Sequence, residues 1–161
     1  MDHNSQGATL RDVMRCYPTG VTVVAVVDAE GAPWGLTVNS FTSLSLDPPL
    51  VLVCIGHDTT SHDRMVAGTG FAISILSASQ RAVARRFASE PSEGRFDSVR
   101  WELAPSGNPI LTEAAGWIDC DLEDARTAGD HSILIGRAVA WSSSDAPPLV
   151  FHRGMLGSIG A

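Results

Sequence analysis

The feature that most constrains the fold is a pair of strand-like segments separated by a short turn. Residues 21–27 form an almost continuous apolar and β-branched run, which favours a central strand buried on both faces over a short helix. Residues 28–33 combine Asp, Gly and Pro as hairpin turns do, and residues 34–39 lead back as a second strand. Strands joined this tightly are expected to be antiparallel neighbours.

Further strand patterns follow along the chain. We expect strands over residues 50–55, 71–76, 117–122, 131–141 and 149–152, the fourth of them interrupted by Gly136. Alternation within residues 117–122 turns three apolar side chains inward and leaves Asp119 and Asp121 outward.

Helices are expected only as short covers, over residues 8–16, 61–67 and 77–88. The last is amphipathic, with Ser77 or Ser79 as its cap and a stripe of Val83, Ala84 and Phe87. Six or more strands in hairpin order with such helices predict a mainly β fold, an antiparallel Greek-key barrel.

Length and composition indicate one domain over residues 1–161, with residues 1–7 disordered. No apolar run approaches the roughly 18 residues of a membrane span, so no membrane association is expected. The N-terminus lacks the basic and apolar regions of a secretory signal, which predicts a cytoplasmic protein. The formal net charge of −7 argues against binding to nucleic acid.

Three widely spaced cysteines, Cys16, Cys54 and Cys120, lie beside apolar neighbours. Their odd number and spacing predict reduced core thiols rather than disulfides or a metal site. The sequence also lacks the G-x-G-x-x-G, P-loop and H-E-x-x-H motifs. Residues 89–108 form the longest unpatterned stretch, a length typical of lids and binding elements.

Residues 34–56 contain an inversion of the strand alternation. Phe41 falls on the polar face while Ser40 and Thr42 fall on the apolar one, and Leu44 and Leu46 restore the original phase. The pattern predicts a bend or bulge that presents hydroxyls, an amide and backbone N–H groups around one spot. A Ser/Thr-rich strand and turn without a ligand is the alternative.

Several short blocks, taken together, resemble the flavin reductase-like family, which is built on an FMN-binding split barrel. The similarity extends over residues 11–154, and the blocks that carry it are YPTGV at 17–21, GLTVNSF at 35–41, DPPL at 47–50, RFA at 86–88, RF at 95–96, GDH at 129–131, PL at 148–149 and RG at 153–154.

The resemblance implies a flavin site along the second strand and the residues after it. The residues implied in flavin binding are Pro18, Thr19, Gly20, Thr37, Asn39, Ser40, Phe41, Thr42, Ser43, Ser45, Cys54, Ile55, Ser61, Arg86 and Phe87. Hydroxyls, N–H groups and a guanidinium suit a flavin phosphate, and apolar walls suit the ring. Arg81, Arg85 and Arg86 otherwise form a solvated cationic face.

The same resemblance implies that His131 lies beside the nicotinamide nucleotide, with Asp130 orienting it. His152 and Arg153 are weaker candidates for this pocket. The family often has an aromatic residue shortly after the final Arg-Gly, where this chain has Met155 and Leu156.

The implied activity is hydride transfer from NADH, with NADPH possible, to FAD or FMN, and release of the reduced flavin to a partner monooxygenase. No side chain is required for acid–base chemistry, and His131 and Asn39 are expected to be positioning groups. The resemblance also implies a homodimer. Unpaired strand edges and an exposed Trp34 are compatible with such a dimer.

Three alternatives stay open at this point. One is a flavin- or haem-binding split-barrel protein that stores or senses its cofactor without turnover. Another is an enzyme similar to pyridoxine-phosphate oxidase, and the third is a ligand-free barrel that binds a protein partner.

Overall fold

The computed structural model describes residues 8–159, so the expected disorder of residues 1–7 lies outside the described residues. The helices are α1 (Leu10–Met14), α2 (His62–Ala67), the 3-10 turn η1 (Ala78–Gln80) and α3 (Arg81–Ser89). The strands are β1 (Thr19–Gly20), β2 (Thr22–Val27), β3 (Pro33–Val38), β4 (Thr42–Leu46), β5 (Pro49–Gly56), β6 (Gly70–Ile75), β7 (Trp101–Leu103), β8 (Pro109–Leu111), β9 (Gly116–Ala128), β10 (His131–Ser143), β11 (Leu149–His152) and β12 (Met155–Ser158).

A seven-stranded antiparallel sheet dominates the molecule, in the order β3-β2-β6-β9-β10-β5-β4. Hairpins are thus joined by crossovers between non-consecutive strands, as in a Greek key. The strands β3 and β4 form the two edges of the described sheet and are linked through residues 39–41. Because they are not hydrogen-bonded neighbours, the sheet is open between them. These features confirm the mainly β, antiparallel fold.

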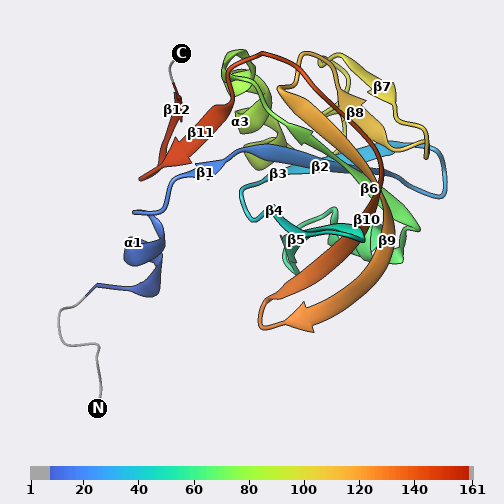
Figure 1. Cartoon of the computed structure of the whole chain (residues 1–161), viewed down its shortest axis with the longest axis horizontal. Helices are drawn as coiled ribbons and strands as arrows, with labels where there is room; N and C mark the ends of the chain where they lie inside the picture. The colour runs from blue at the N-terminus through green and yellow to red at the C-terminus, as the bar shows by residue number, and fades with distance from the viewer. Residues whose placement is uncertain (1–7, 160–161) are drawn as a thin grey trace.

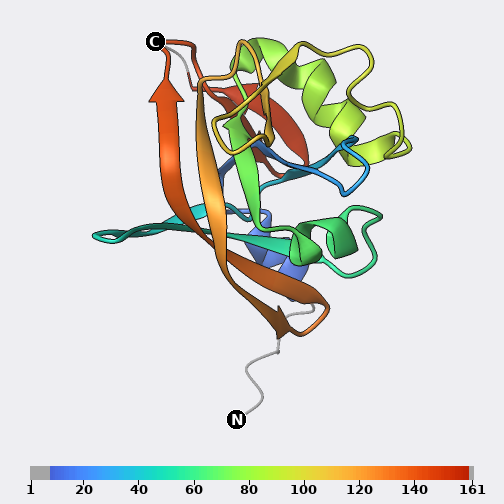
Figure 2. The ribbon, with the colours of Figure 1, turned by 90° about the vertical axis from the view of Figure 1, so that its right-hand side faces the viewer.

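The long strands β9 and β10 bend along their course (Figure 2). Their register shifts between Ile135 and Gly136 and again between Ala138 and Ala140. A Cβ at Gly136 would lie 2.6 Å from Phe71 Cζ and 2.8 Å from Cys120 Cβ. The predicted interruption at Gly136 is therefore a bulge at a close approach to the core.

The central strand β2 is buried on both faces, as predicted. Val24 and Val26 pack into the interior of the sheet with Phe71 and Leu134, while Val23 and Ala25 pack against the layer that contains α3. The 3-10 turn η1, which leads directly into α3, begins with the predicted capping box between Ser77 and Gln80.

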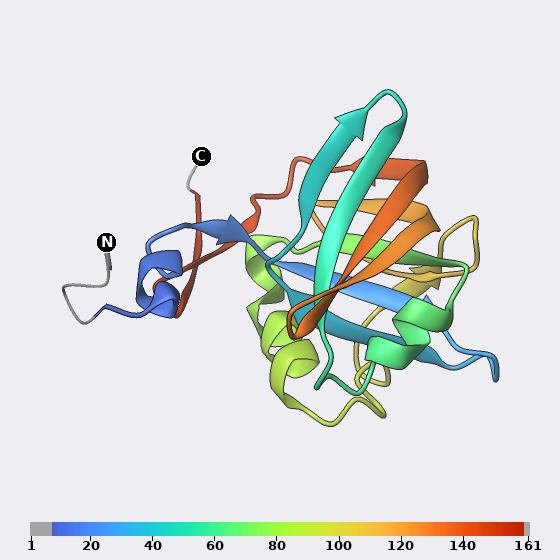
Figure 3. The same ribbon diagram turned by 90° about the horizontal axis from the view of Figure 1, so that it is seen from below.

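A smaller sheet, β1-β11-β12, extends to one side of the main sheet, and α1 lies beside it (Figures 1 and 3). A capping box between Thr9 and Asp12 begins α1, but none of its residues is buried. Its apolar side chains Leu10 and Val13 are 77% and 59% exposed. This helix therefore presents an apolar face that the described residues do not cover.

Asp119 is buried, contrary to the predicted outward position. Its carboxylate accepts hydrogen bonds from the Ser106 N–H at 2.8 Å and the Ser106 hydroxyl at 2.5 Å. The reason is that residues 89–108 cover this face of the sheet: they include β7, and Phe96 packs edge-on against Phe87. This segment is thus part of the packing of the fold.

The other differences concern exposure. Leu44 and Leu46 are 47% and 91% exposed, because β4 is an edge strand of a hairpin that projects from the body (Figure 2). Trp34 is half-buried beneath Arg64 and donates to Asp28.

Cys16, expected in the core, is exposed because it follows α1, whereas Cys54 and Cys120 are shielded and all three thiols are free. No helix within residues 8–159 is long and apolar enough to cross a membrane.

Candidate functional site

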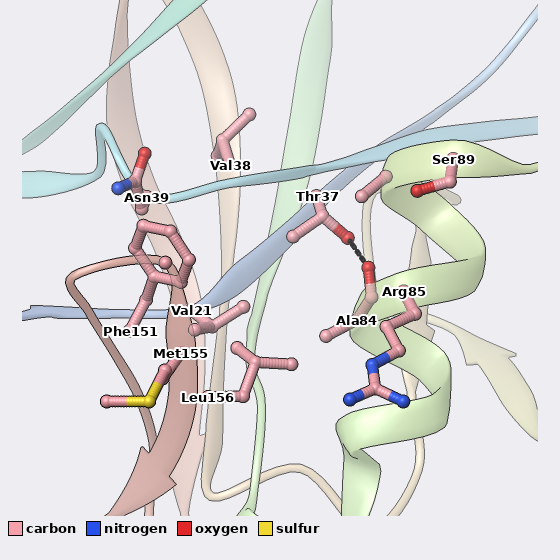
Figure 4. A pocket seen from close by; sticks show the side chains of 12 residues that line it. Val21, Thr37, Val38, Asn39, Ala84, Arg85, Ser89, Phe151, Met155 and Leu156 are labelled. Carbon is pink, nitrogen blue, oxygen red and sulfur yellow. Dashed lines mark hydrogen bonds between the residues drawn. The ribbon is translucent and has the colours of Figure 1, made fainter. Parts of the chain in front are cut away.

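A groove of about 590 Å³ lies between β3, α3 and the β11–β12 hairpin (Figure 4). We call it the central groove. It is lined by Val21, Thr37, Val38, Asn39, Ala84, Arg85, Ala88, Ser89, Phe151, Gly154, Met155 and Leu156. Figure 4 shows Asn39 and Phe151 on one side and the α3 side chains Arg85 and Ser89 on the other.

Two further cavities adjoin the central groove. The first, of about 670 Å³, is called the N-terminal pocket and is lined by Arg11, Met14, Arg15, Tyr17, Pro18, Thr19, Gly20, Asn39, Ser40, Phe41, Thr42, Phe151 and Gly154. The second, of about 330 Å³, is called the loop pocket and is lined by Leu36, Thr37, Asp58, Thr59, Thr60, Ser61, Phe87, Ala88 and Arg95. Shared lining residues make the three cavities one continuous surface along residues 36–42.

Two hydroxyls on this surface are engaged in the fold. The Thr37 hydroxyl donates to the carbonyl of Ala84 at 2.8 Å and so fastens β3 to α3 (Figure 4). Ser40 Oγ donates to the Cys54 carbonyl at 2.8 Å and accepts from the Cys54 N–H at 3.1 Å. Ser40 thus replaces a ladder partner of β5 at the bend, and its donor is no longer free for a ligand.

Other polar groups on the surface are free to contact a ligand. The Asn39 amide and the Arg85 guanidinium both line the central groove and have no side-chain hydrogen bond or ion pair with the described residues. The hydroxyls of Thr19 and Ser61 are buried and lack partners within residues 8–159. Buried hydroxyls without partners are rare, and these two border the N-terminal and loop pockets.

The strand pairing explains the position of the Pro18-Thr19-Gly20 segment. Thr19 pairs with Phe151 and Gly20 pairs with Val150, so β11 holds the segment at the rim of the N-terminal pocket. A Cβ on Gly20 would meet no atom within 4 Å. The missing side chain therefore leaves backbone open to a ligand at this point.

His131 lies at a different corner, where β10 begins opposite Gly56. Its Nδ1 is 2.6 Å from the Asp130 carboxylate, and this hydrogen bond is the main reason that the pKa of Asp130 is lowered. A Cβ on Gly56 would lie 2.9 Å from Asp58 Oδ1 and 3.7 Å from both His131 Nε2 and Thr59 Cγ2. His131 is therefore next to two residues of the loop pocket but does not line the central groove.

Some of the expected flavin-binding residues lie on the continuous surface, and others lie outside it. Those brought together on the continuous surface are Pro18, Thr19, Gly20, Thr37, Asn39, Ser40, Phe41, Thr42, Ser61 and Phe87. His152 and Arg153 lie just outside it, next to Phe151 and Gly154.

Four expected residues are placed elsewhere. Ser43 and Ser45 lie on the projecting β4, Ile55 is fully buried in the core, and Arg86 forms an ion pair with Glu90 at 3.6 Å. The position of Arg86 follows from helix geometry, because successive side chains are turned by about 100°, and Arg85 lines the groove. Cys54 contributes only its backbone, to Ser40.

Eight lining residues were not among the expected site residues: Arg11, Arg15, Tyr17, Arg85, Ser89, Phe151, Met155 and Leu156. Half of these belong to α1 or to the β11–β12 hairpin, whose strands are short and whose β11 pairs with the distant β1. The apolar side chains of Phe151, Met155 and Leu156 form one wall of the groove (Figure 4). Apolar walls with a few polar groups are typical of cofactor sites.

The chain matches the family model described as flavin reductase like domain over residues 14–160. A probable flavin reductase of Rhizobium meliloti (strain 1021) is 46% identical over 145 residues, which cover 90% of this chain and 46% of that protein. The stachydrine N-demethylase reductase subunit Stc3 of the same organism is 45% identical over 145 residues, 90% of this chain and 63% of that protein. The chain thus spans about half to two thirds of the length of these relatives.

Among solved structures, the Streptomyces globisporus C-1027 NADH:FAD oxidoreductase SgcE6, in complex with NAD and FAD fragments, has a TM-score of 0.88 and 38% identity. The alignment covers 94% of this chain and 91% of that chain. Since the family model spans residues 14–160, the chain belongs to the family of flavin reductase like domains.

Proposed function

We propose that this chain is an NADH-dependent flavin reductase that reduces FAD or FMN and releases the reduced flavin to a partner monooxygenase. The observation that carries the proposal is the continuous surface along residues 36–42, with an apolar wall and free polar groups, in a chain of this family. NADPH remains the second nicotinamide donor to test.

The names of similar proteins support both parts of the proposal. The structural neighbour from Streptomyces globisporus is an NADH:FAD oxidoreductase. The Rhizobium meliloti relative is the reductase subunit of an N-demethylase, which supports a separate oxygenase as the recipient of reduced flavin.

The free groups of the site fit a flavin. The Asn39 amide can both donate to and accept from the polar edge of the ring, and Arg85 can bind a phosphate. Phe151 and Leu156 supply apolar wall for the ring system. When bound, the flavin supplies the ring nitrogen that accepts a hydride from the dihydronicotinamide.

The protein's contribution is to bind and orient the two reactants. The Thr37 bond to Ala84 and the Ser40 bonds to Cys54 fix the backbone that carries Asn39, so the groove is preorganised. His131 is proposed as a positioning group for the nicotinamide nucleotide at the loop pocket, with Asp130 fixing its ring. This chemistry requires no nucleophile or acid–base residue.

We also propose that the chain forms a homodimer in the cytoplasm. Exposed apolar side chains on α1, on the β4–β5 hairpin and on β10 support a second copy as their cover; they are Leu10, Val13, Leu46, Val139 and Trp141. The three free cysteines suit the reducing cytoplasm, where NADH is available.

The test is steady-state NADH consumption by the purified protein, with and without added FAD or FMN. Consumption that depends on added flavin is the expected result, and it ranks the two flavins. A protein that purifies with bound flavin or haem and consumes no NADH would instead be a storage or sensor protein.

A further inference from the structure

The arginines of this chain are unevenly distributed. All eleven basic residues are arginines in a chain with a formal net charge of −7. Five form ion pairs with carboxylates, and Arg95 binds the backbone carbonyls of Gly35 and Glu90. Five other arginines have no ion pair to a described carboxylate. Arg11 and Arg15 line the N-terminal pocket, Arg85 lines the central groove, Arg153 is next to the lining residue Gly154, and Arg81 lines none of these cavities.

Two of these arginines line the N-terminal pocket from one helix. Arg11 and Arg15 are four residues apart, which places them on the same face of α1. The neighbouring carboxylate of Asp12 accepts from the N–H and hydroxyl of Thr9, at 2.9 and 2.7 Å. That carboxylate caps the helix, and within the described residues neither guanidinium forms a side-chain hydrogen bond or ion pair, so both have donors for a ligand.

Arg153 is held against the end of the same helix. Its N–H donates to the Arg15 carbonyl at 3.2 Å, and its guanidinium lies 3.6 Å from the Cys16 sulfur. The φ angle of Arg153 is +51°, in the left-handed region that side chains rarely adopt. The β11–β12 turn thus adds a third positive charge beside the pocket.

Three aromatic side chains also line the pocket. Tyr17, Phe41 and Phe151 line it, together with Thr19, whose buried hydroxyl has no partner in the described part of the chain. Guanidinium groups bind phosphates through paired N–H donors, and aromatic faces stack on heterocyclic bases. Phosphate and base occur together in a nucleotide.

We propose that the N-terminal pocket binds the adenosine diphosphate half of a dinucleotide, with Arg11 and Arg15 on the phosphates and the aromatic side chains against adenine. The pocket shares Asn39, Phe151 and Gly154 with the central groove, so one dinucleotide extends across both. The inference rests on the proposed reductase function. FAD and NADH both carry this half, whereas FMN lacks it.

The experiment compares wild type with the double variant Arg11→Gln/Arg15→Gln. ADP binding is measured by calorimetry, and KM is measured for FAD, FMN and NADH. The control is Arg81→Gln, which removes one positive charge from an exposed site outside the three cavities. Circular dichroism checks that each variant folds. The single variant Arg153→Gln removes the third positive charge without any substitution in α1.

We expect the double variant to bind ADP about tenfold more weakly or worse, and the control to bind it as wild type does. A raised KM for FAD with unchanged KM for FMN assigns the pocket to FAD, and a raised KM for NADH assigns it to NADH. Absence of ADP binding to wild type, equal binding by the double variant, or unchanged KM for both dinucleotides would overturn the proposal. Failure of the reductase function appears separately, as wild type that does not oxidise NADH with FMN.

Discussion

At the scale of single residues, the bend after β3 separates polar groups that maintain the fold from polar groups that face the groove. The hydroxyls of Thr37 and Ser40 donate hydrogen bonds to backbone carbonyls. Asn39, between them, carries a free amide into the groove (Figure 4). The inversion of alternation at residues 40–42 therefore marks a bend in the backbone, and this bend leaves Asn39 exposed.

The three cysteines should differ in reactivity. Burial raises the pKa of the Cys54 thiol and raises that of Cys120 to about 12, so both stay protonated at neutral pH, while Cys16 is exposed. We expect one thiol to react rapidly with a maleimide at pH 7 and all three to react in denaturant. Peptide mapping that finds Cys120 labelled in the native protein would contradict this packing.

His131 should affect one reactant more than the other. We expect His131→Ala to raise KM for NADH by about two- to tenfold, because one hydrogen bond to the nucleotide is lost. KM for flavin should change by less than about twofold, since His131 lies outside the central groove. Equal rises in both constants would remove His131 from the nucleotide site.

At the scale of elements, the crossing of β10 over the core depends on the absence of a side chain at Gly136. Gly136→Ala should destabilise the protein by about 1–3 kcal/mol, because the new Cβ overlaps Phe71 and Cys120, both fully buried. Gly157→Ala on β12 is the control, with no atom within 4 Å of its Cβ, and should change stability by less than about 0.5 kcal/mol. Urea denaturation measures both, and equal stabilities would contradict the close approach.

Elements whose signals are local were predictable from the sequence. The β2–β3 hairpin, the Ser77–Gln80 capping box and the bulge at Gly136 all follow from neighbouring residues. The short strands β1, β7, β8 and β12 were missed, because two to four residues carry little periodicity and their partners set them.

Local sequence pattern predicted the candidate site along one strand and the bend after it, whereas Pro18, Thr19, Gly20, Ser61 and Phe87 were expected only from the family resemblance. Residues 37–42 were expected together and do lie together. The burial of Asp119 and the choice of Arg85 over Arg86 depend on which segments pack nearby, and no local pattern contains that information. The exposure of Leu46 has the same origin, since it depends on the projection of an edge hairpin.

At the scale of the whole molecule, the exposed apolar side chains lead to a test of assembly. Light scattering should give twice the chain mass of 17.0 kDa. Leu46→Arg should shift the protein toward monomer, because a charge at a buried interface is costly. Leu103→Arg on β7, also at an exposed leucine, should leave the dimer intact. A monomeric wild type, or equal effects of the two variants, would contradict a dimer through the β4–β5 hairpin.

The central claim, that the surface along residues 36–42 brings NADH and flavin together, is tested most directly by anaerobic reduction of FAD. NADH and FAD are mixed without oxygen in the presence of catalytic amounts of the protein, and the loss of flavin absorbance is followed with NADH or with NADH deuterated at nicotinamide C4. The account predicts bleaching that far exceeds the protein-free rate, saturates with FAD and removes deuterium, as deuteride, from only one of the two C4 positions of NADH. Bleaching at the protein-free rate, by protein that nevertheless binds FAD, would contradict it.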